Sequence, residues 1–409
     1  MSEPLKVLMM GGRRCGKTSA LASLFEQMIN GDVKNHFTVA DRTTLETKGG
    51  GERQESLLDK SLELQYMLAT NKESSNIFLV DKGPTRNYWL YKLCLQIPGR
   101  SQEMYIEFRD SNGEFFEASG LQAEETIGYI RNCDVFVVVI DTPYLMGPVE
   151  KATKDICPEA INLGVNRVKD IQNFLTNIND NEGKDAKMVV FVPLKCEKWM
   201  HENRINEVVQ RVKKVYDTCI QNLMAYEKMN ISIIPMETSG NILFSELREA
   251  FLYKDELHQY EELYQPDMPG VVRCCKIDDS IIRLENGDNK FLDKNEMQNV
   301  IIDSTSIING INKKRPYSWF HIRLGNNDCA PRNCEQLPLH IIRFMLAKLN
   351  DAQNNKKGGL IGWFTDIIKR IMAIFGSIDP NKLLEIIIDM QKKGVIKDSG
   401  CGIEILRKF

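Results

Sequence analysis

A glycine-rich stretch near the N-terminus carries the residue types that bind phosphate groups. The apolar run 5–10 leads into GGRRCGKT at 11–18, which fits the pattern G-x-x-x-x-G-K-[ST], and a helix-like stretch follows at 19–29. Loop amides and the N-terminus of the following helix offer donors to an anion, and the glycines permit its close approach. Lys17 can reach the β and γ phosphates, and the Thr18 hydroxyl can ligate Mg²⁺. We therefore expect a nucleoside triphosphate site formed by Gly11, Gly12, Arg13, Arg14, Cys15, Gly16, Lys17, Thr18 and Ser19.

A second candidate phosphate and metal element follows another apolar segment. The extended stretch 104–108 leads into DSNG at 110–113. In a nucleotide switch, an aspartate at the end of a strand holds Mg²⁺ through water, so Asp110 is the expected metal residue. The amide of Gly113 can reach the γ-phosphate. A plain turn is the alternative, because all four residue types are favoured in turns.

A threonine is expected to close over the metal and the γ-phosphate. Thr85 directly precedes the strand-like segment 88–97 and is therefore preferred, while Thr43 and Thr44 are competing candidates. The turn Pro98-Gly99-Arg100 joins that segment to the next one and predicts a β-hairpin-like pair. The predicted metal residues are Thr18, Thr85 and Asp110.

Further apolar runs predict the rest of a sheet. They lie at 135–140, 188–192 and 231–235. Helix-like patterns at 160–175 and 205–224 separate them, which predicts an α/β fold with a doubly wound, mostly parallel sheet. Ligands of such sheets bind at the carboxyl ends of the strands. The last two runs end in LKCE at 194–197 and ETSG at 237–240.

Together these motifs resemble those of the Ras-like, TRAFAC-type P-loop GTPases over roughly the first 250 residues. The resemblance implies a Ras-like G domain that binds GTP or GDP with Mg²⁺. It implies that the Lys195 stem packs on the purine and that the Glu197 carboxylate accepts from the guanine N1 and N2 hydrogens. Ser239, with the amide of Gly240, then lies at the guanine O6 side. The alternative for Ser239 is the N-cap of a helix at 242–251.

The base-reading segment departs from the family pattern at two positions. Leu194 stands where the family has Asn or Thr, and Glu197 stands where it has the shorter Asp. An ATPase therefore remains an alternative. The compact motif set with Lys195-Cys196-Glu197 is also similar to bacterial GTPases of the double-GTPase group associated with conflict systems.

Two positions are unusual for catalysis. Glu114 follows Gly113, where Ras-like enzymes place a water-orienting glutamine, and a carboxylate beside a γ-phosphate is unfavourable unless it acts as a base or rotates away. Arg14 matches the loop arginine of guanylate-binding proteins, which acts as an internal finger. The alternative is a guanidinium that faces solvent or a surface carboxylate. The resemblance implies catalytic roles for Lys17, Arg14, Thr85 and Glu114.

Composition indicates a soluble, cytoplasmic protein. The 409 residues include 53 basic and 56 acidic side chains, so the net charge of −3 gives no electrostatic reason to expect nucleic acid. The eleven cysteines lack the spacing of a disulfide framework, and we expect reduced thiols. The N-terminal apolar run is too short for a signal peptide, and no apolar run approaches the roughly 20 residues of a membrane span.

The rest of the chain is expected to form two further units. We predict a GTPase domain at 1–255, a mixed subdomain or insertion ending in a helix at 256–350, and a helical module at 351–409. Residues 360–375 have the amphipathic spacing of a membrane-surface or partner-docking helix, but a core helix is favoured because another helix follows. A zinc site could be imagined from four cysteines and two histidines, but no paired C-x-x-C supports it, and buried or free thiols are expected. These residues are Cys274, Cys275, Cys329, Cys334, His321 and His340.

The expected function is that of a nucleotide-dependent switch. The protein would hydrolyse GTP to GDP and phosphate, with Lys17 and Mg²⁺ neutralising charge, and would change its affinity for a protein effector or a second copy of itself. A non-hydrolysing, nucleotide-gated interaction module is the alternative that Glu114 favours.

Overall fold

The structure of the protein is a computed structural model. It describes residues 3–12, 15–45, 54–70, 88–101, 103–111, 124–146, 158–178, 186–226, 228–240, 242–252, 282–284, 301–302, 317–323, 329–357, 361–376 and 378–408.

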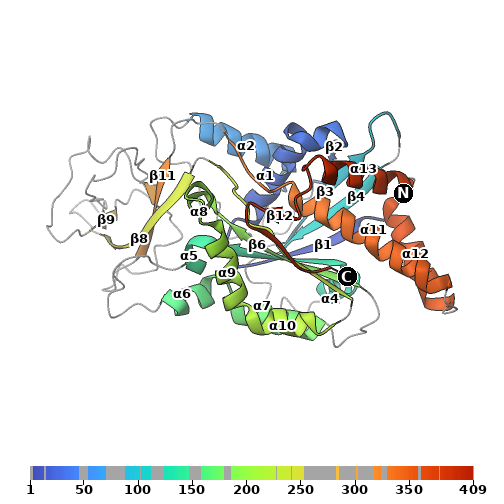
Figure 1. The fold of residues 1–409 in the computed structure, drawn as a ribbon. Helices are drawn as coiled ribbons and strands as arrows, with labels where there is room; N and C mark the ends of the chain where they lie inside the picture. The colour runs from blue at the N-terminus through green and yellow to red at the C-terminus, as the bar shows by residue number, and fades with distance from the viewer. Residues whose placement is uncertain are drawn as a thin grey trace.

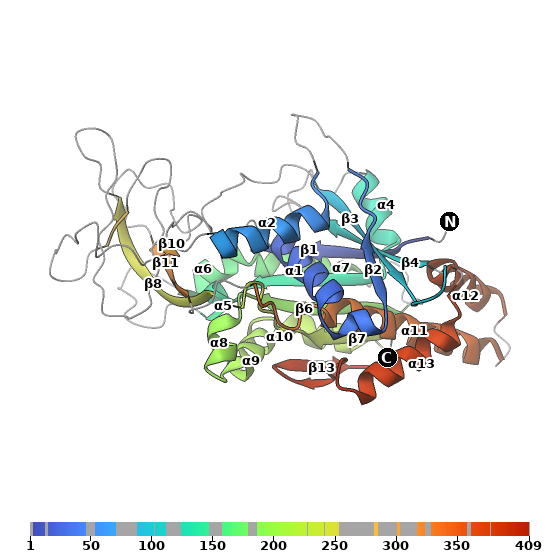
Figure 2. The same ribbon diagram turned by 90° about the horizontal axis from the view of Figure 1, so that it is seen from above.

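A nine-stranded sheet forms the centre of the protein (Figures 1 and 2). Its strand order is β12-β13-β7-β6-β5-β1-β4-β3-β2. The strands from β7 to β4 pair in parallel, and the flanking strands on both sides pair antiparallel. The predicted α/β fold with a mostly parallel sheet is therefore confirmed. The bounds are β1 (Leu5–Met10), β2 (Thr38–Asp41), β3 (Trp89–Gln96), β4 (Glu103–Asp110), β5 (Val135–Asp141), β6 (Lys187–Leu194), β7 (Met229–Ile233), β12 (Ser399–Gly400) and β13 (Ile403–Arg407).

Helices cover both faces of this sheet. In Figure 1, α1, α11 and α13 lie above it, α7, α9 and α10 lie below it, and α12 extends to the right. The bounds are α1 (Lys17–Asn30), η1 (Asp32–Asn35), α2 (Leu57–Thr70), α4 (Glu124–Arg131), α5 (Thr142–Met146), α6 (Pro158–Val165), α7 (Val168–Ile178), α8 (Glu197–His201), α9 (Ile205–Val215), α10 (Asp217–Met224), α11 (Gln336–Lys357), α12 (Ile361–Phe375) and α13 (Pro380–Lys392).

The central strands are apolar along their whole length because both of their faces are buried. On β5, Val137 and Val139 point into a core shared with α1 and α11, whereas Phe136 and Val138 point into a core shared with α7 and α9. Every residue of β5 is buried. Such a strand shows a continuous β-branched run rather than alternation, which is why its position was readable from the sequence.

Two predicted helices are each divided in two. The pattern at 160–175 forms α6 and α7, which are separated at Arg167, a residue with a φ of 52°. The pattern at 205–224 forms α9 and α10, which are separated at Tyr216. Apolar periodicity continues across both breaks, so it gives no signal of where a helix turns.

The prediction of a helix at 242–251 is wrong. These residues form strand β8 (Ile242–Leu252), which pairs antiparallel with β11 (Tyr317–Arg323) and β9 (Ile282–Leu284). With β10 (Ile301–Ile302) they make a second, four-stranded sheet. The segment has a local preference for helix, but it forms a strand because it pairs with β11, far along the chain. Tertiary contacts can override local preference in this way. Ser239 is therefore not the N-cap of a helix here.

The C-terminal part of the chain packs onto the central sheet. Ile371, Ile374 and Phe375 of α12 are buried in the same core as β1 and α1, and β13 pairs with β7. The described part of the apolar face that suggested a membrane helix is thus used in packing, as the core-helix interpretation expected. The division into 1–255, 256–350 and 351–409 stays a prediction.

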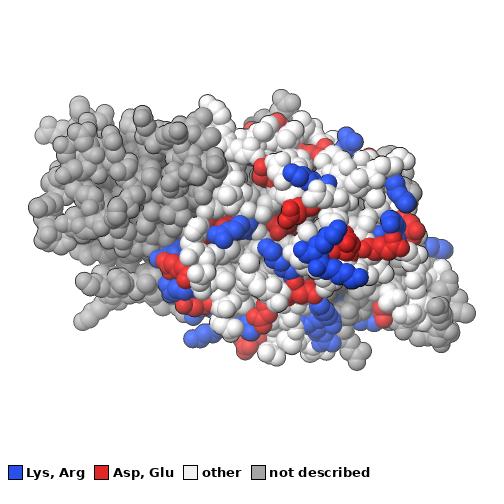
Figure 3. Space-filling view, turned by 45° about the horizontal axis from the view of Figure 1, so that its top comes forward, with Lys and Arg blue, Asp and Glu red and all other residues white. Residues whose placement is uncertain are grey.

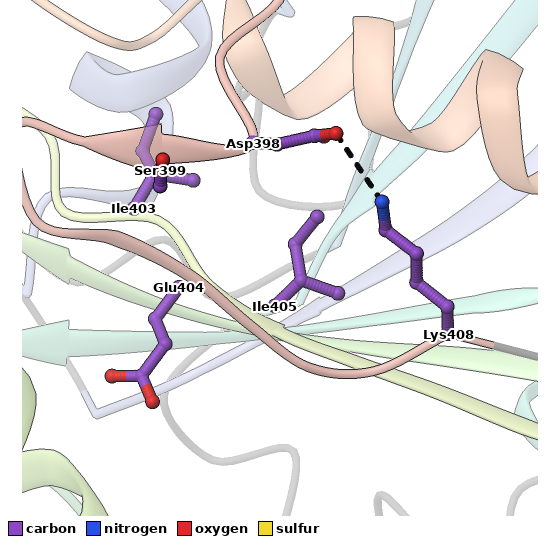
Figure 4. Close-up of a pocket in the computed structure, with 6 residues that line it drawn as sticks. All are labelled: Asp398, Ser399, Ile403, Glu404, Ile405 and Lys408. Carbon is purple, nitrogen blue, oxygen red and sulfur yellow. Dashed lines mark hydrogen bonds and ion pairs between the residues drawn. The ribbon is translucent and has the colours of Figure 1, made fainter.

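α13 is a capped helix, and a β-hairpin follows it. Asp379 caps α13 by accepting from the amide of Asn381 at 3.0 Å, and Pro380 occupies the first turn. The hairpin formed by β12 and β13 borders a pocket of 350 Å³, shown in Figure 4. Lys408 reaches across it to Asp398 at 3.2 Å.

The described surface mixes charges of both signs. Figure 3 shows Lys and Arg interspersed with Asp and Glu on the face in view. Every described cysteine is a free thiol. Within the described ranges, no helix is both long and apolar enough to cross a membrane.

Candidate nucleotide-binding site

The glycine-rich loop connects the carboxyl end of β1 to the first turn of α1. Gly16 adopts a left-handed conformation with a φ of 100° directly before the helix. A Cβ atom added to Gly11 would lie 2.7 Å from the Val139 carbonyl oxygen, and one on Gly12 would lie 1.8 Å from the Val165 oxygen. Neighbouring backbone thus approaches the loop so closely that only glycine fits at 11 and 12.

Lys17 lies across this loop. Its Nζ donates to the carbonyl oxygens of Gly11 at 3.3 Å and Gly12 at 3.0 Å, and the side chain is buried. The Cys15 thiol is buried beside it, while Ser19 is exposed on α1. The loop therefore holds the ammonium group at the place where phosphate oxygens are expected.

Thr18 and Asp110 meet at the same end of the sheet. β1 pairs in parallel with β4 so that Met9 lies opposite Asp110, and the Thr18 hydroxyl donates to Asp110 Oδ2 at 2.5 Å. Burial raises the pKa of the Asp110 carboxyl, while Lys17 and the bond from Thr18 act to lower it. A nearly buried carboxylate beside a hydroxyl suits a hard cation, because Mg²⁺ prefers oxygen ligands. These two residues fit the predicted metal site.

The predicted base-reading segment follows β6. The side chain of Leu194 packs beside the glycine-rich loop, with its Cδ1 atom 3.4 Å from a Cβ added to Gly16. Lys195 has a φ of 60°, and its Nζ pairs with Asp141 Oδ2 at 2.6 Å. Asp141 ends β5 directly opposite Leu194 in the sheet. Lys195 is thus placed next to the glycine-rich loop, and the Asp141 carboxylate holds its ammonium group.

Glu197 is buried and is bonded to the 237–240 loop. Its Oε1 accepts from the Thr238 amide at 2.9 Å, the Ser239 amide at 3.0 Å and the Ser239 hydroxyl at 3.1 Å. Gly240 lies next in this row of amides, with its nitrogen 3.5 Å from the same oxygen. The structure therefore brings Glu197, Ser239 and Gly240 together through contacts with one another.

Comparison with known proteins assigns the family. The family model described as Double-GTPase 2 matches residues 7–242, which include the glycine-rich loop, Asp110 and the loops after β6 and β7. The chain belongs to the Double-GTPase 2 family. The expected resemblance to double-GTPases is confirmed, and GTP binding is supported by this membership. No curated protein matches the chain in sequence.

Solved structures similar to this double-GTPase chain include two of the Ski7 GTPase-like domain of S. cerevisiae. One is bound to GDP and inorganic phosphate and the other to GTP. Each shares 16% sequence identity with the chain, with a TM-score of 0.34, over 58% of this chain and 43% of the Ski7 chain. The matched region therefore spans less than half of the Ski7 chain.

Two residues of the double-GTPase site were not expected from the sequence. Asp141 follows an apolar run, which signalled only the end of a strand. Asn166 is buried in the turn between α6 and α7, where its Oδ1 accepts from the Asp141 amide at 2.7 Å and its Nδ2 donates to the Asp141 carbonyl at 3.2 Å. This clamp fixes the backbone of Asp141 and hence the partner of Lys195. No local pattern marks Asn166, because it lies inside a stretch with helical periodicity.

The remaining predicted site residues of this double-GTPase lie outside the described residues. They are Arg13, Arg14, Thr85, Gly113 and Glu114. Thr43, one of the alternatives to Thr85, is described, and its hydroxyl accepts from the amide of Lys92 on β3 at 3.1 Å.

Proposed function

We propose that the protein binds GTP with Mg²⁺ and hydrolyses it to GDP and phosphate as a cytoplasmic, nucleotide-dependent switch. The observation that carries this proposal is the meeting of Thr18, Asp110 and Lys17 at the glycine-rich loop of a Double-GTPase 2 chain. Phosphoryl transfer requires a positive charge near the phosphates, oxygen ligands for a metal ion and hydrogen-bond donors to the phosphate oxygens. Lys17, the pair Thr18 and Asp110, and the glycine-rich loop would supply them.

In the proposed reaction, water attacks the γ-phosphorus in line and the bond to the β–γ bridging oxygen breaks. Thr18 and Asp110 would hold Mg²⁺, with Thr85 as a third candidate residue. When bound, the ion neutralises charge on the β and γ phosphate oxygens. Lys17 binds the same oxygens through its Nζ, which already lies beside the loop carbonyls. Gly113 is proposed to sense the γ-phosphate through its amide.

Guanine is the proposed base. Lys195 would cover the purine with its stem, and Glu197 would accept from the N1 and N2 hydrogens. Glu197 is an acceptor of fixed orientation, because the 237–240 loop holds its Oε1. Adenine lacks this pair of adjacent donors, so a carboxylate that accepts from the base here favours guanine.

Turnover is tested by phosphate release. The wild-type protein should release several phosphates per chain from GTP, and Lys17→Ala should abolish this release. As a matched control, Lys198→Ala changes a lysine on α8 and should leave turnover unchanged. Tight binding of GTP with negligible release by the wild-type protein would instead favour the non-hydrolysing module that Glu114 suggests.

Arg14 is proposed as an internal finger that stabilises charge in the transition state. Arg14→Ala should then lower turnover and leave the dissociation constant for GTP nearly unchanged. Equal losses in turnover and affinity would contradict this role. The switch proposal adds that Thr85 and the segment after Asp110 order around GTP and so change the affinity for an effector or a second copy of the chain.

A further inference from the structure

The 237–240 loop is paired with a segment that lies some 90 residues further along the chain. After Gly240 the chain enters the four-stranded sheet at β8, and it returns at 329–333, here named the return segment, before α11 begins. Glu237 and Arg332 exchange two backbone hydrogen bonds of 3.1 Å, and the Ala330 amide donates to the Ser239 carbonyl at 2.9 Å. The outgoing and returning chains therefore form a short antiparallel pair at the site itself.

This pairing is close. A Cβ atom added to Gly240, which has a φ of 76°, would lie 2.0 Å from the carbonyl oxygen of Ala330. The return segment thus packs directly against the loop at Gly240. The Ser23 hydroxyl on α1 also contacts the loop by donating to the Thr238 carbonyl at 2.7 Å.

Arg332 adds an ion pair to the backbone pairing. Its Nε and Nη2 both donate to the Glu237 carboxylate, in the forked arrangement typical of arginine and a carboxylate. The Glu237 side chain is fully buried, whereas that of Arg332 is 49% exposed. Burial raises the pKa of the Glu237 carboxyl to about 7, and the guanidinium acts in the opposite direction. Without Arg332, Glu237 would be a buried carboxylate lacking its forked donor.

We infer that Arg332 is a positioning residue for guanine recognition, because it fixes the 237–240 loop against the return segment. The inference rests on the proposed function, in which Glu197, held by the 237–240 loop, accepts from the guanine. Glu237 directly precedes residues 238–240, whose amides face the Glu197 carboxylate. Movement of Glu237 would therefore shift the amides that orient Glu197, the proposed base-reading residue. Base selectivity then depends on a residue that follows the inserted sheet rather than on the nucleotide motifs alone.

The test is the ratio of affinities for GDP and ADP, measured by calorimetry with Mg²⁺ present. Arg332→Ala should weaken GDP binding by about tenfold or more, the order expected when charge-assisted hydrogen bonds are lost. ADP binding should change little, because the glycine-rich loop still holds the phosphates. Arg332→Lys, which keeps the charge, should recover part of the ratio. A general structural defect would weaken both nucleotides alike.

Arg343→Ala is the matched control. Arg343 also pairs with a carboxylate, that of Asp398, but it lies on α11 away from the 237–240 loop. This variant should keep the wild-type ratio. Should Arg332→Ala fail to fold, Arg332→Gln, which keeps an N–H donor without the charge, is measured with the same expectation.

An unchanged GDP to ADP ratio in a folded Arg332 variant, or parallel loss of both nucleotides, would overturn the inference. Failure of the proposed function has a different signature, since the wild-type protein would then show no preference for GDP over ADP.

Discussion

The Thr18 hydroxyl donates to Asp110 Oδ2 across 2.5 Å, although the two residues lie 92 positions apart. Parallel pairing of β1 with β4 produces this contact, because the helix after β1 and the carboxyl end of β4 meet at one edge of the sheet. Asp110 is nearly buried, and Lys17 lowers the pKa of its carboxyl against the effect of burial. The pair therefore places a hydroxyl and a carboxylate next to Lys17, where the proposed Mg²⁺ would need oxygen ligands.

Removal of the Thr18 hydroxyl should weaken Mg²⁺-dependent binding. Thr18→Val keeps the shape of the side chain and loses an oxygen ligand, so the apparent Mg²⁺ affinity in the presence of a GTP analogue should fall by about tenfold or more. Titration of Mg²⁺ into the protein with a fluorescent analogue measures this change. Thr176→Val on α7, whose hydroxyl donates to the Gln172 carbonyl of the same helix, is the control. An unaltered Mg²⁺ titration of Thr18→Val would argue against the metal assignment.

Loss of the Glu197 carboxylate should destabilise the fold. Glu197→Ala removes the acceptor of the Thr238 amide and of the amide and hydroxyl of Ser239. Leaving such buried donors unsatisfied costs about 1–3 kcal/mol, so the free energy of unfolding should fall by that order. Denaturant unfolding measures it, with the exposed Glu202→Ala at the end of α8 as control. Equal stability of the two variants would show that the 237–240 loop does not depend on Glu197.

Gly12→Ala should disrupt the phosphate loop. The added methyl group would overlap the Val165 carbonyl oxygen at 1.8 Å, so the turn between α6 and α7 must move. Such overpacking costs about 1–3 kcal/mol, and nucleotide affinity should fall with it. Gly164→Ala is the neighbouring control, because a Cβ there meets no described atom within 4 Å. Thermal unfolding and analogue binding should separate the two variants. Wild-type behaviour of Gly12→Ala would contradict the described loop geometry.

Acid should destabilise the packing of α11 through His340. Its Nε2 donates to the Lys397 carbonyl at 2.9 Å and its Nδ1 accepts from Arg343 at 3.2 Å, so the buried ring is neutral. Burial lowers the pKa of His340 from 6.5 to about 4, with Arg343 acting in the same direction. The unfolded chain therefore binds the proton more tightly. The stability from neutral His340 is present above pH 6.5 and is lost as the pH falls from 6.5 through 4.

The size of this effect follows from the shift. Between pH 7.5 and pH 5, the wild-type protein should lose about 2 kcal/mol more unfolding free energy than His340→Gln, which does not titrate. Denaturant unfolding at the two pH values measures the difference. Parallel losses in the two proteins would assign the pH dependence to other groups.

Local sequence signals predicted the structural setting of the glycine-rich loop and of Asp110 well. The loop motif sits between β1 and α1 as expected, and Asp110 ends a strand as its apolar run indicated. These predictions succeed because local sequence determines both features. A buried parallel strand must be apolar throughout. Glycine is required at 11 and 12 because neighbouring backbone leaves no room there for a Cβ atom.

The parts that sequence reasoning missed depend on distant contacts. Residues 242–252 form a strand because β11 pairs with them, which no local pattern reveals. Asn166, in the turn between α6 and α7, contacts Asp141, and Arg332, in the return segment, contacts Glu237. Neither residue belongs to a sequence motif. Glu197 was predicted to read the base, and its bonds to the 237–240 loop arise only when the sheet brings two strand ends together.

Guanine recognition is the central claim, and calorimetric titration with non-hydrolysable analogues of GTP and ATP in Mg²⁺ tests it most directly. We predict binding of the GTP analogue alone, because Asp141 holds Lys195 and the 237–240 loop holds Glu197 in a Double-GTPase 2 chain. Equal or preferential binding of the ATP analogue would contradict the GTPase account while leaving the phosphate loop in place.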